Sequence, residues 1–170
     1  MELEHSRIER QGLGVVFRTP PNVQLLGRLR GGAFRAVPTA VGPPDYLLLL
    51  SHEAGPIPVA LEAKDCAGPR WALKQLHDHQ ADSLRRWSDC GGLGVVALRH
   101  GPSDSLWLLP WQKLGPIWQR WKSAKEGGHV PRGTASLGLG DLHNIGVQWR
   151  FGIDYCSRLI GSFVNLKSEI

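Results

Sequence analysis

The stretch IPVALEAK at residues 57–64 decides the fold of this 170-residue chain. Its odd positions, from Ile57 to Ala63, are all apolar, whereas its even positions end in Glu62 and Lys64. Because side chains two residues apart share one face of a strand, this pattern predicts a strand that buries one face and presents a carboxylate and an ammonium on the other. Buried charge without a partner is costly, so this pair of charges needs a structural partner or a function.

A second apolar strand is expected at Tyr46–Leu50, directly after Pro44 and Asp45. A hairpin that joins the two strands would return Glu62 beside Asp45. Two carboxylates and a carbonyl form an oxygen site of the kind that Mg²⁺ prefers, and such a metal polarises a phosphodiester and activates a bound water. A lysine beside it orients that water or stabilises charge in the transition state. The residues therefore indicate phosphodiester hydrolysis, with an ordinary salt bridge of Lys64 as the alternative.

The surrounding sequence predicts one α/β domain over residues 1–170, with a mixed central β-sheet flanked by helices. Further strands are expected over residues 15–18, 33–37, 93–99 and 105–109, and a loop over 125–133. Helices are expected over residues 3–11, 70–89, 110–122 and 153–164, with a short helical turn over 140–144.

Two polar side chains interrupt the apolar stripe of the expected helix 70–89. His77 and Gln80 either form hydrogen bonds in the core or face the same cleft as Glu62 and Lys64. His79 falls off the stripe, so His77 and His79 are expected to diverge, and the seven histidines show no spacing typical of zinc ligands. The stripe itself consists of Leu73, Leu76, Leu84 and Trp87.

The formal net charge of +5 is concentrated near the N-terminus, where six arginines accompany one acid, Glu9. The planar guanidinium suits phosphate oxygens, so this segment favours a polyanion such as nucleic acid, with a solvated surface as the alternative. The expected contacts to DNA phosphates are Arg7, Arg10, Arg18, Arg28, Arg30 and Arg35. Trp107 and three tryptophans at helical spacing could stack on bases, but the spacing of Trp111, Trp118 and Trp121 favours core packing or a dimer seam.

Membrane and secreted classes are disfavoured. No apolar run reaches the roughly 18 residues that span a membrane, and the N-terminus MELEHSRIER is not a signal peptide. Three cysteines, Cys66, Cys90 and Cys156, are an odd number without metal-site spacing, which favours a reducing cytoplasm over a disulfide scaffold.

The Pro44-Asp45 and Glu62-Ala63-Lys64 pattern resembles that of the PD-(D/E)xK nuclease superfamily. More narrowly, residues 15–160 resemble the RecU family of Holliday junction resolvases. The matching motifs, in order, are Phe17–Gln24, Ala33–Arg35, Asp45-Tyr46, Leu61–Lys64, Leu76–Gln80 (LHDHQ), Gly91–Val96, Leu106–Pro110, Ser136–Asp141 and Asp154-Tyr155.

The resemblance implies a restriction-endonuclease-like core and a homodimer that cuts four-way DNA junctions with Mg²⁺ or Mn²⁺. It also implies that the protein acts in the cytoplasm of a prokaryotic or phage-infected cell. It implies that Asp45 and Glu62 are metal ligands, that Lys64 is the catalytic lysine and that Gln80 supports the site. The family also has an acidic residue on its first helix. The candidates for it are Glu2, Glu4 and Glu9, of which Glu4 is the closest match.

Two features depart from the RecU pattern. The stalk between the first two strands is reduced to a segment at about residues 22–32, and Pro44 replaces the usual threonine, as in archaeal Hjc-type resolvases. The region at about residues 111–170 is expected to be helical. Two alternatives stay open: a nuclease that acts on linear or other branched duplex DNA, and a DNA-binding module without catalysis.

Overall fold

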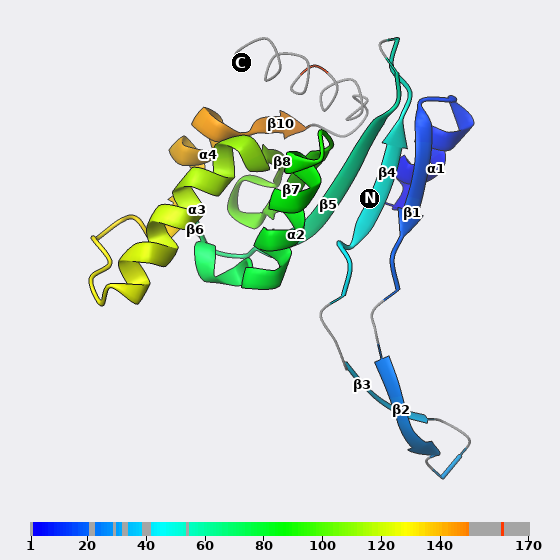
Figure 1. Ribbon diagram of the computed structural model, residues 1–170, viewed down its shortest axis with the longest axis horizontal. Helices are drawn as coiled ribbons and strands as arrows, with labels where there is room; N and C mark the ends of the chain where they lie inside the picture. Colours follow the sequence, from blue (N-terminus) through cyan, green and yellow to red (C-terminus); the bar gives the residue numbers. More distant parts are fainter. Residues whose placement is uncertain are drawn as a thin grey trace.

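A computed structural model describes residues 2–20, 23–28, 30–31, 34–38, 42–53, 55–149 and 161. Its centre is a six-stranded mixed sheet in the order β1-β4-β5-β7-β8-β10 (Figure 1). Within this sheet the pair β5–β7 is parallel, and the other four pairs are antiparallel. The expected α/β class with a mixed sheet is therefore confirmed. The strands are β1 (Gly14–Arg18), β4 (Tyr46–Leu50), β5 (Ile57–Cys66), β7 (Leu93–His100), β8 (Ser105–Pro110) and β10 (Val147–Trp149).

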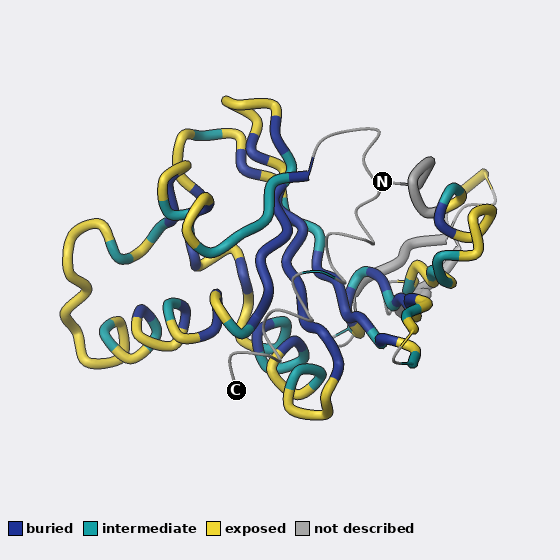
Figure 2. Tube along the Cα trace, turned by 90° about the horizontal axis from the view of Figure 1, so that it is seen from above, coloured by how far each residue is buried: buried dark blue, intermediate teal, exposed yellow. Residues whose placement is uncertain are grey.

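Helices cover both faces of this sheet. On one face, α2 (Asp78–Asp89) and α3 (Trp111–Glu126) pack on the even-numbered residues of β5 and β7, and α4 (Leu139–Ile145) joins the same cluster beside β8, β9 (Ser136–Gly138) and β10. On the other face, Ile8 of α1 (Glu2–Arg10) joins a second cluster with the odd-numbered residues of the same strands. The central strands are therefore buried on both sides (Figure 2).

The prediction of a helix over residues 70–89 is wrong for residues 70–77. Arg70–Ala72 form strand β6, which pairs with β9 (Ser136–Gly138), and a 3₁₀ turn (Leu73–Gln75) follows before α2 begins at Asp78. The Trp71 side chain of β6 is completely buried. A contact between segments more than 60 residues apart thus overrides the local helical pattern.

The expected strand at residues 33–37 is present as β3 (Phe34–Pro38), but it does not join the central sheet. It pairs with β2 (Val23–Arg28) in a separate two-stranded sheet with a register shift between Leu25 and Gly27. The two strands project away from the core (Figure 1). The segment at about residues 22–32 therefore contains a strand as well as part of the connection to β3.

The other elements follow the prediction with shifted ends. Helix α3 continues to Glu126, so the loop begins at Gly127, and the region after residue 111 contains the short strands β9 and β10 as well as helices. The expected helix at 153–164 lies outside the described residues, apart from Gly161. Among the described helices, none is both long and apolar enough to span a lipid bilayer.

The four tryptophans considered for base stacking lie in the core. Trp107, Trp111, Trp118 and Trp121 all belong to the cluster beneath α2 and α3, and each is less than a tenth exposed. Core packing is therefore the correct interpretation of the helical spacing of Trp111, Trp118 and Trp121. Little of these four side chains is exposed for base stacking or for a dimer seam.

Candidate active site

The pairing of β4 with β5 brings Asp45 to Glu62. Tyr46 lies opposite Leu61 in the antiparallel register, so Asp45, one residue before β4, lies at the level of Glu62. The Asp45 carboxylate accepts a hydrogen bond from the Ala63 N–H through Oδ2 at 2.8 Å. The expected hairpin arrangement of the two carboxylates is therefore present.

Glu62 is nearly inaccessible, with 2% of its surface exposed. Burial and the neighbouring Asp45 carboxylate raise the pKa of Glu62 to about 7, against a smaller opposing effect of Lys64. Two carboxylates held this close, one of them buried, are a hard-oxygen donor pair that suits a divalent cation such as Mg²⁺. Among the residues that the structure describes, no third His, Cys, Asp or Glu side chain joins them.

Gln80 connects the charged groups of the site. Its Nε2 donates to Glu62 Oε2 at 2.7 Å, while its Oε1 accepts from Lys64 Nζ at 2.8 Å. Lys64 Nζ lies 3.7 Å from Glu62 Oε2, so its short contact is with the amide and not with the carboxylate. Lys64 is thus more than one half of a simple salt bridge, and the prediction that Gln80 faces Glu62 and Lys64 is correct.

The start of α2 positions this glutamine. His77 is the extended residue before the helix, and its N–H donates to Gln80 Oε1 at 3.2 Å, which satisfies an otherwise unpaired donor at the helix start. Two expectations for the histidines are wrong, namely that His77 lies in the core or faces the cleft and that His77 and His79 diverge. The His77 side chain is exposed, and its ring stacks on that of His79 with centroids 5.7 Å apart, because His77 lies outside the helix.

The three candidate N-terminal glutamates occupy α1. Glu9 Oε1 accepts from the Val16 N–H at 3.2 Å and so binds the backbone of β1, away from Glu62. Glu2 and Glu4 belong to the first turn of the helix, and their side chains lie outside the described residues. A tight turn reverses the chain between α1 and β1, which places this first turn toward the Arg18 end of β1.

The six arginines follow α1, β1 and the β2–β3 hairpin. Arg18 ends β1 opposite Tyr46, one residue from Asp45. Arg7 and Arg10 lie on α1, Arg28 and Arg35 lie in β2 and β3 with side chains outside the described residues, and Arg30 is exposed between these two strands.

Thr19 is a site-supporting residue that the sequence reasoning missed. Its hydroxyl donates to the Pro44 carbonyl, and its N–H donates to the Asp45 carbonyl at 3.0 Å. Thr19 thereby fixes the backbone that carries Asp45. Thr19 directly follows one predicted strand, and Asp45 directly precedes the strand that pairs with it. This placement is the signal that could have identified Thr19.

Comparison of the chain with known proteins and protein families agrees with part of this arrangement. No curated protein matches the chain. The family model of RecU, described as recombination protein U, matches residues 54–132. The matched segment contains Glu62, Lys64 and Gln80, whereas Asp45 precedes it. Over residues 54–132 the chain is therefore similar to the RecU family of recombination proteins, as its motifs indicate.

Proposed function

We propose that this protein is a Mg²⁺- or Mn²⁺-dependent endonuclease that cuts four-way DNA junctions as a homodimer, in recombination, repair or phage DNA processing. The observation that carries the proposal is the linked set Asp45, Glu62, Lys64 and Gln80, most of which lies within the segment similar to RecU.

Asp45 and Glu62 are the residues that would hold the cation. Bound there, a divalent metal supplies polarisation of the phosphodiester and a lower pKa for a water. The fold keeps the two carboxylates together although this raises the pKa of Glu62 to about 7. Such an arrangement is unfavourable for the bare protein and is relieved by a cation, which supports the assignment.

Lys64 would stabilise the negative charge that develops on the phosphate. Its ammonium has three protons, and the Gln80 amide accepts one of them at 2.8 Å. Gln80 is itself anchored to the start of α2, so the ammonium is held in place before the substrate arrives. A preorganised charge of this kind costs little reorganisation during the reaction.

The arginines would hold the DNA by its phosphates. Arg18 lies at the strand end next to Asp45, and the other five are carried by α1 and by the segment that contains the β2–β3 hairpin. Contacts of this kind position a duplex and do not read its sequence. Resolution needs two symmetric cuts, which a two-fold assembly supplies. Cys66 and Cys90 are free thiols, which supports a reducing cytoplasm as the compartment.

The decisive experiment incubates the protein with a labelled four-way junction beside a matched linear duplex, in Mg²⁺, in Mn²⁺ and in EDTA. We expect metal-dependent cleavage of the junction. Equal cleavage of the linear duplex would favour the alternative nuclease, and binding without cleavage in either metal would favour a non-catalytic module.

Substitutions of the site residues test which side chains are needed for cleavage. Asp45→Asn, Glu62→Gln and Lys64→Ala should each abolish cleavage and leave junction binding intact. Asp65→Asn is the matched control, because Asp65 follows Lys64 on the same strand but is exposed and pairs with Arg99 at 3.0 Å. Full activity in any of the three site variants would contradict the assignment.

Gln80→Ala tests the positioning role of the amide. Loss of a group that orients catalytic residues lowers activity by roughly tenfold to a hundredfold. We expect the maximal cleavage rate to fall by about that factor while junction affinity stays unchanged. An unchanged rate would show that Lys64 and Glu62 do not depend on the amide.

A further inference from the structure

An apolar strip lies uncovered on the central sheet, on the face that carries α2. Val15, Phe17 and Leu49 are 43%, 62% and 46% exposed. Val15 pairs with Leu49, and Phe17 pairs with Leu47, which packs against the cluster beneath α2. The three side chains therefore adjoin on one face and expose on the order of 300 Å² of apolar surface, which is within the range of the largest apolar patch of a typical monomer, a patch that is often functional.

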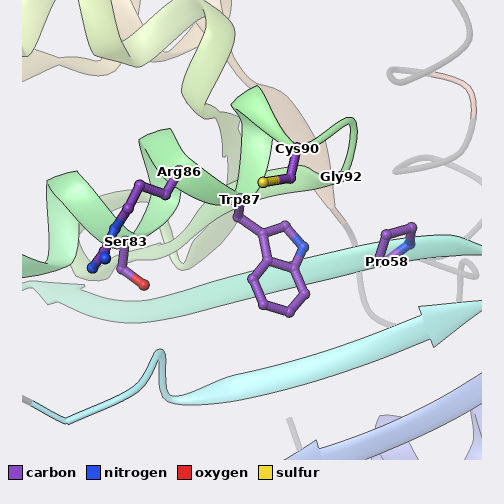
Figure 3. A pocket seen from close by; sticks show the side chains of 6 residues that line it. All are labelled: Pro58, Ser83, Arg86, Trp87, Cys90 and Gly92. Carbon is purple, nitrogen blue, oxygen red and sulfur yellow. The ribbon is translucent and has the colours of Figure 1, made fainter.

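A pocket of about 380 Å³ opens beside this strip, between α2 and β5. Leu49 of the strip pairs with Pro58 of the pocket wall. In Figure 3 the Trp87 indole projects from α2 across β5, and Cys90 lies at the end of the helix. The Trp87 Nε1 is buried without a hydrogen-bond partner among the described residues. The full lining is Pro58, Ser83, Arg86, Trp87, Cys90 and Gly92.

We propose that this face is the interface with a second copy of the chain, and that Phe17 of each copy enters the Trp87 pocket of the other. The inference rests on the homodimer of the proposed function and names its contact surface. Phe17 is a protruding apolar side chain and the pocket is an apolar hollow, and both lie on the same face of the same molecule. A two-fold interface needs such self-complementarity.

The strand order provides the geometry. β4 lies between β1 and β5, so a two-fold axis that lies in the interface and runs along β4 exchanges the two copies and places the β1 side of one over the β5 and α2 side of the other. Each Phe17 then faces the other copy's pocket, while Leu49 lies near the axis and meets its own equivalent. The two α2 helices each cover the sheet face that the other copy leaves open.

The chemistry of the strip favours protein over DNA. Its side chains carry no charge, whereas a DNA surface needs cations to match the phosphates. The one charged residue of the pocket wall, Arg86, pairs with Asp82 at 3.0 Å. An apolar centre with a polar rim is the anatomy of a protein interface, which typically covers about 800 Å² on each partner.

The outer edge of β1 is not the contact. The N–H of Val16 is already occupied by Glu9 Oε1 at 3.2 Å, which obstructs the addition of another strand there. The face of the sheet, and not its edge, is therefore the surface through which a second copy binds.

A cysteine substitution tests this contact directly. In Phe17→Cys, the new thiol should form a disulfide with the native Cys90 of the other copy under mild oxidation with oxidised glutathione. The expected product is a covalent dimer on a non-reducing gel, with the linked peptides identified by mass spectrometry. A bond formed within one chain would leave the product a monomer.

Two controls accompany it. Adding Cys90→Ser to Phe17→Cys should remove the dimer band, which excludes linkage through the other cysteines. Leu139→Cys, at an exposed position on α4, should give no bond to Cys90. In sedimentation, Phe17→Asp and Leu49→Asp should weaken the dimer at least tenfold, whereas Val130→Asp, in the exposed loop after α3, should not.

The outcomes separate this inference from the proposed function. A dimeric wild type, combined with a Phe17→Cys variant whose new thiol forms no bond to Cys90, overturns the interface and leaves the nuclease standing. A specific bond in a protein that cuts no junction supports the interface and contradicts the nuclease. If the Phe17→Asp variant stays dimeric but binds junctions more weakly, the strip contacts DNA and the proposed interface is wrong. A monomeric wild type would also contradict the interface.

Discussion

Replacing Glu62 by Gln should stabilise the metal-free protein at pH 8 but not at pH 4.5. The pKa of Glu62 rises from 4.5 to about 7 on folding, because the carboxyl is buried beside Asp45. A group whose folded-state pKa is raised stabilises the fold fully below its unfolded pKa and loses that contribution as the pH rises through the folded pKa. The wild type therefore weakens between about pH 4.5 and pH 7, and the glutamine variant lacks this loss.

The magnitude follows from the shift. About 2.5 pH units at 1.36 kcal/mol each correspond to about 3 kcal/mol of unfolding free energy. For a domain of this size, that equals roughly 6–12 °C in melting temperature. In Glu62→Gln, the introduced amide oxygen would keep the hydrogen bond with Gln80 Nε2, so the comparison isolates the charge.

The assay is thermal unfolding of both proteins in EDTA across pH 4.5 to 8, with Glu53→Gln at an exposed position as the control. Added Mg²⁺ should raise the melting temperature of the wild type at pH 8 and leave Glu62→Gln nearly unchanged. Parallel pH profiles for wild type and Glu62→Gln would refute the reasoning, because they would show that Glu62 carries no charge penalty.

Three further predictions concern packing and DNA contacts. Trp107→Phe should cost about 1 kcal/mol more than Trp71→Phe in chemical denaturation, because both indoles are buried but only that of Trp107 donates a hydrogen bond; equal losses would contradict this. Gly92→Ala should destabilise by about 1–3 kcal/mol, since a Cβ there lies 2.6 Å from the Trp87 ring, while Gly140→Ala meets nothing within 4 Å and should not. Arg30→Ala should lower the salt dependence of junction binding by about one phosphate contact, and an unchanged slope would exclude Arg30 from the interface.

The part of the site that could be predicted depends on short-range pattern. The alternation in residues 57–64 fixes which side chains share a face of β5, and a short connection back to β4 makes antiparallel pairing the simplest solution. That is why the approach of Asp45 to Glu62 follows from the sequence. The facing of Gln80 also follows, because residues 80–87 are helical and keep the period of the helix.

What could not be predicted depends on distant segments. Nothing local in Arg70–Ala72 indicates that residues 136–138 will pair with it, so the apolar spacing of Leu73 and Leu76 extends the predicted helix too far toward the N-terminus. The same spacing assigns His77 to a helical face that does not exist at that position. The contact of Glu9 is also hard to predict, because its carboxylate binds a backbone group of β1 and not a side chain.

The contact between Glu9 and the Val16 N–H has a consequence for how large an assembly can grow. Pairing through a free strand edge has no built-in end, since each added chain offers a new edge, and such growth produces filaments and aggregates. With this edge obstructed, association through the proposed two-fold face would stop at two copies. A variant such as Glu9→Ala exposes this strand edge and should therefore form larger aggregates, which would raise the turbidity of the solution at high protein concentration.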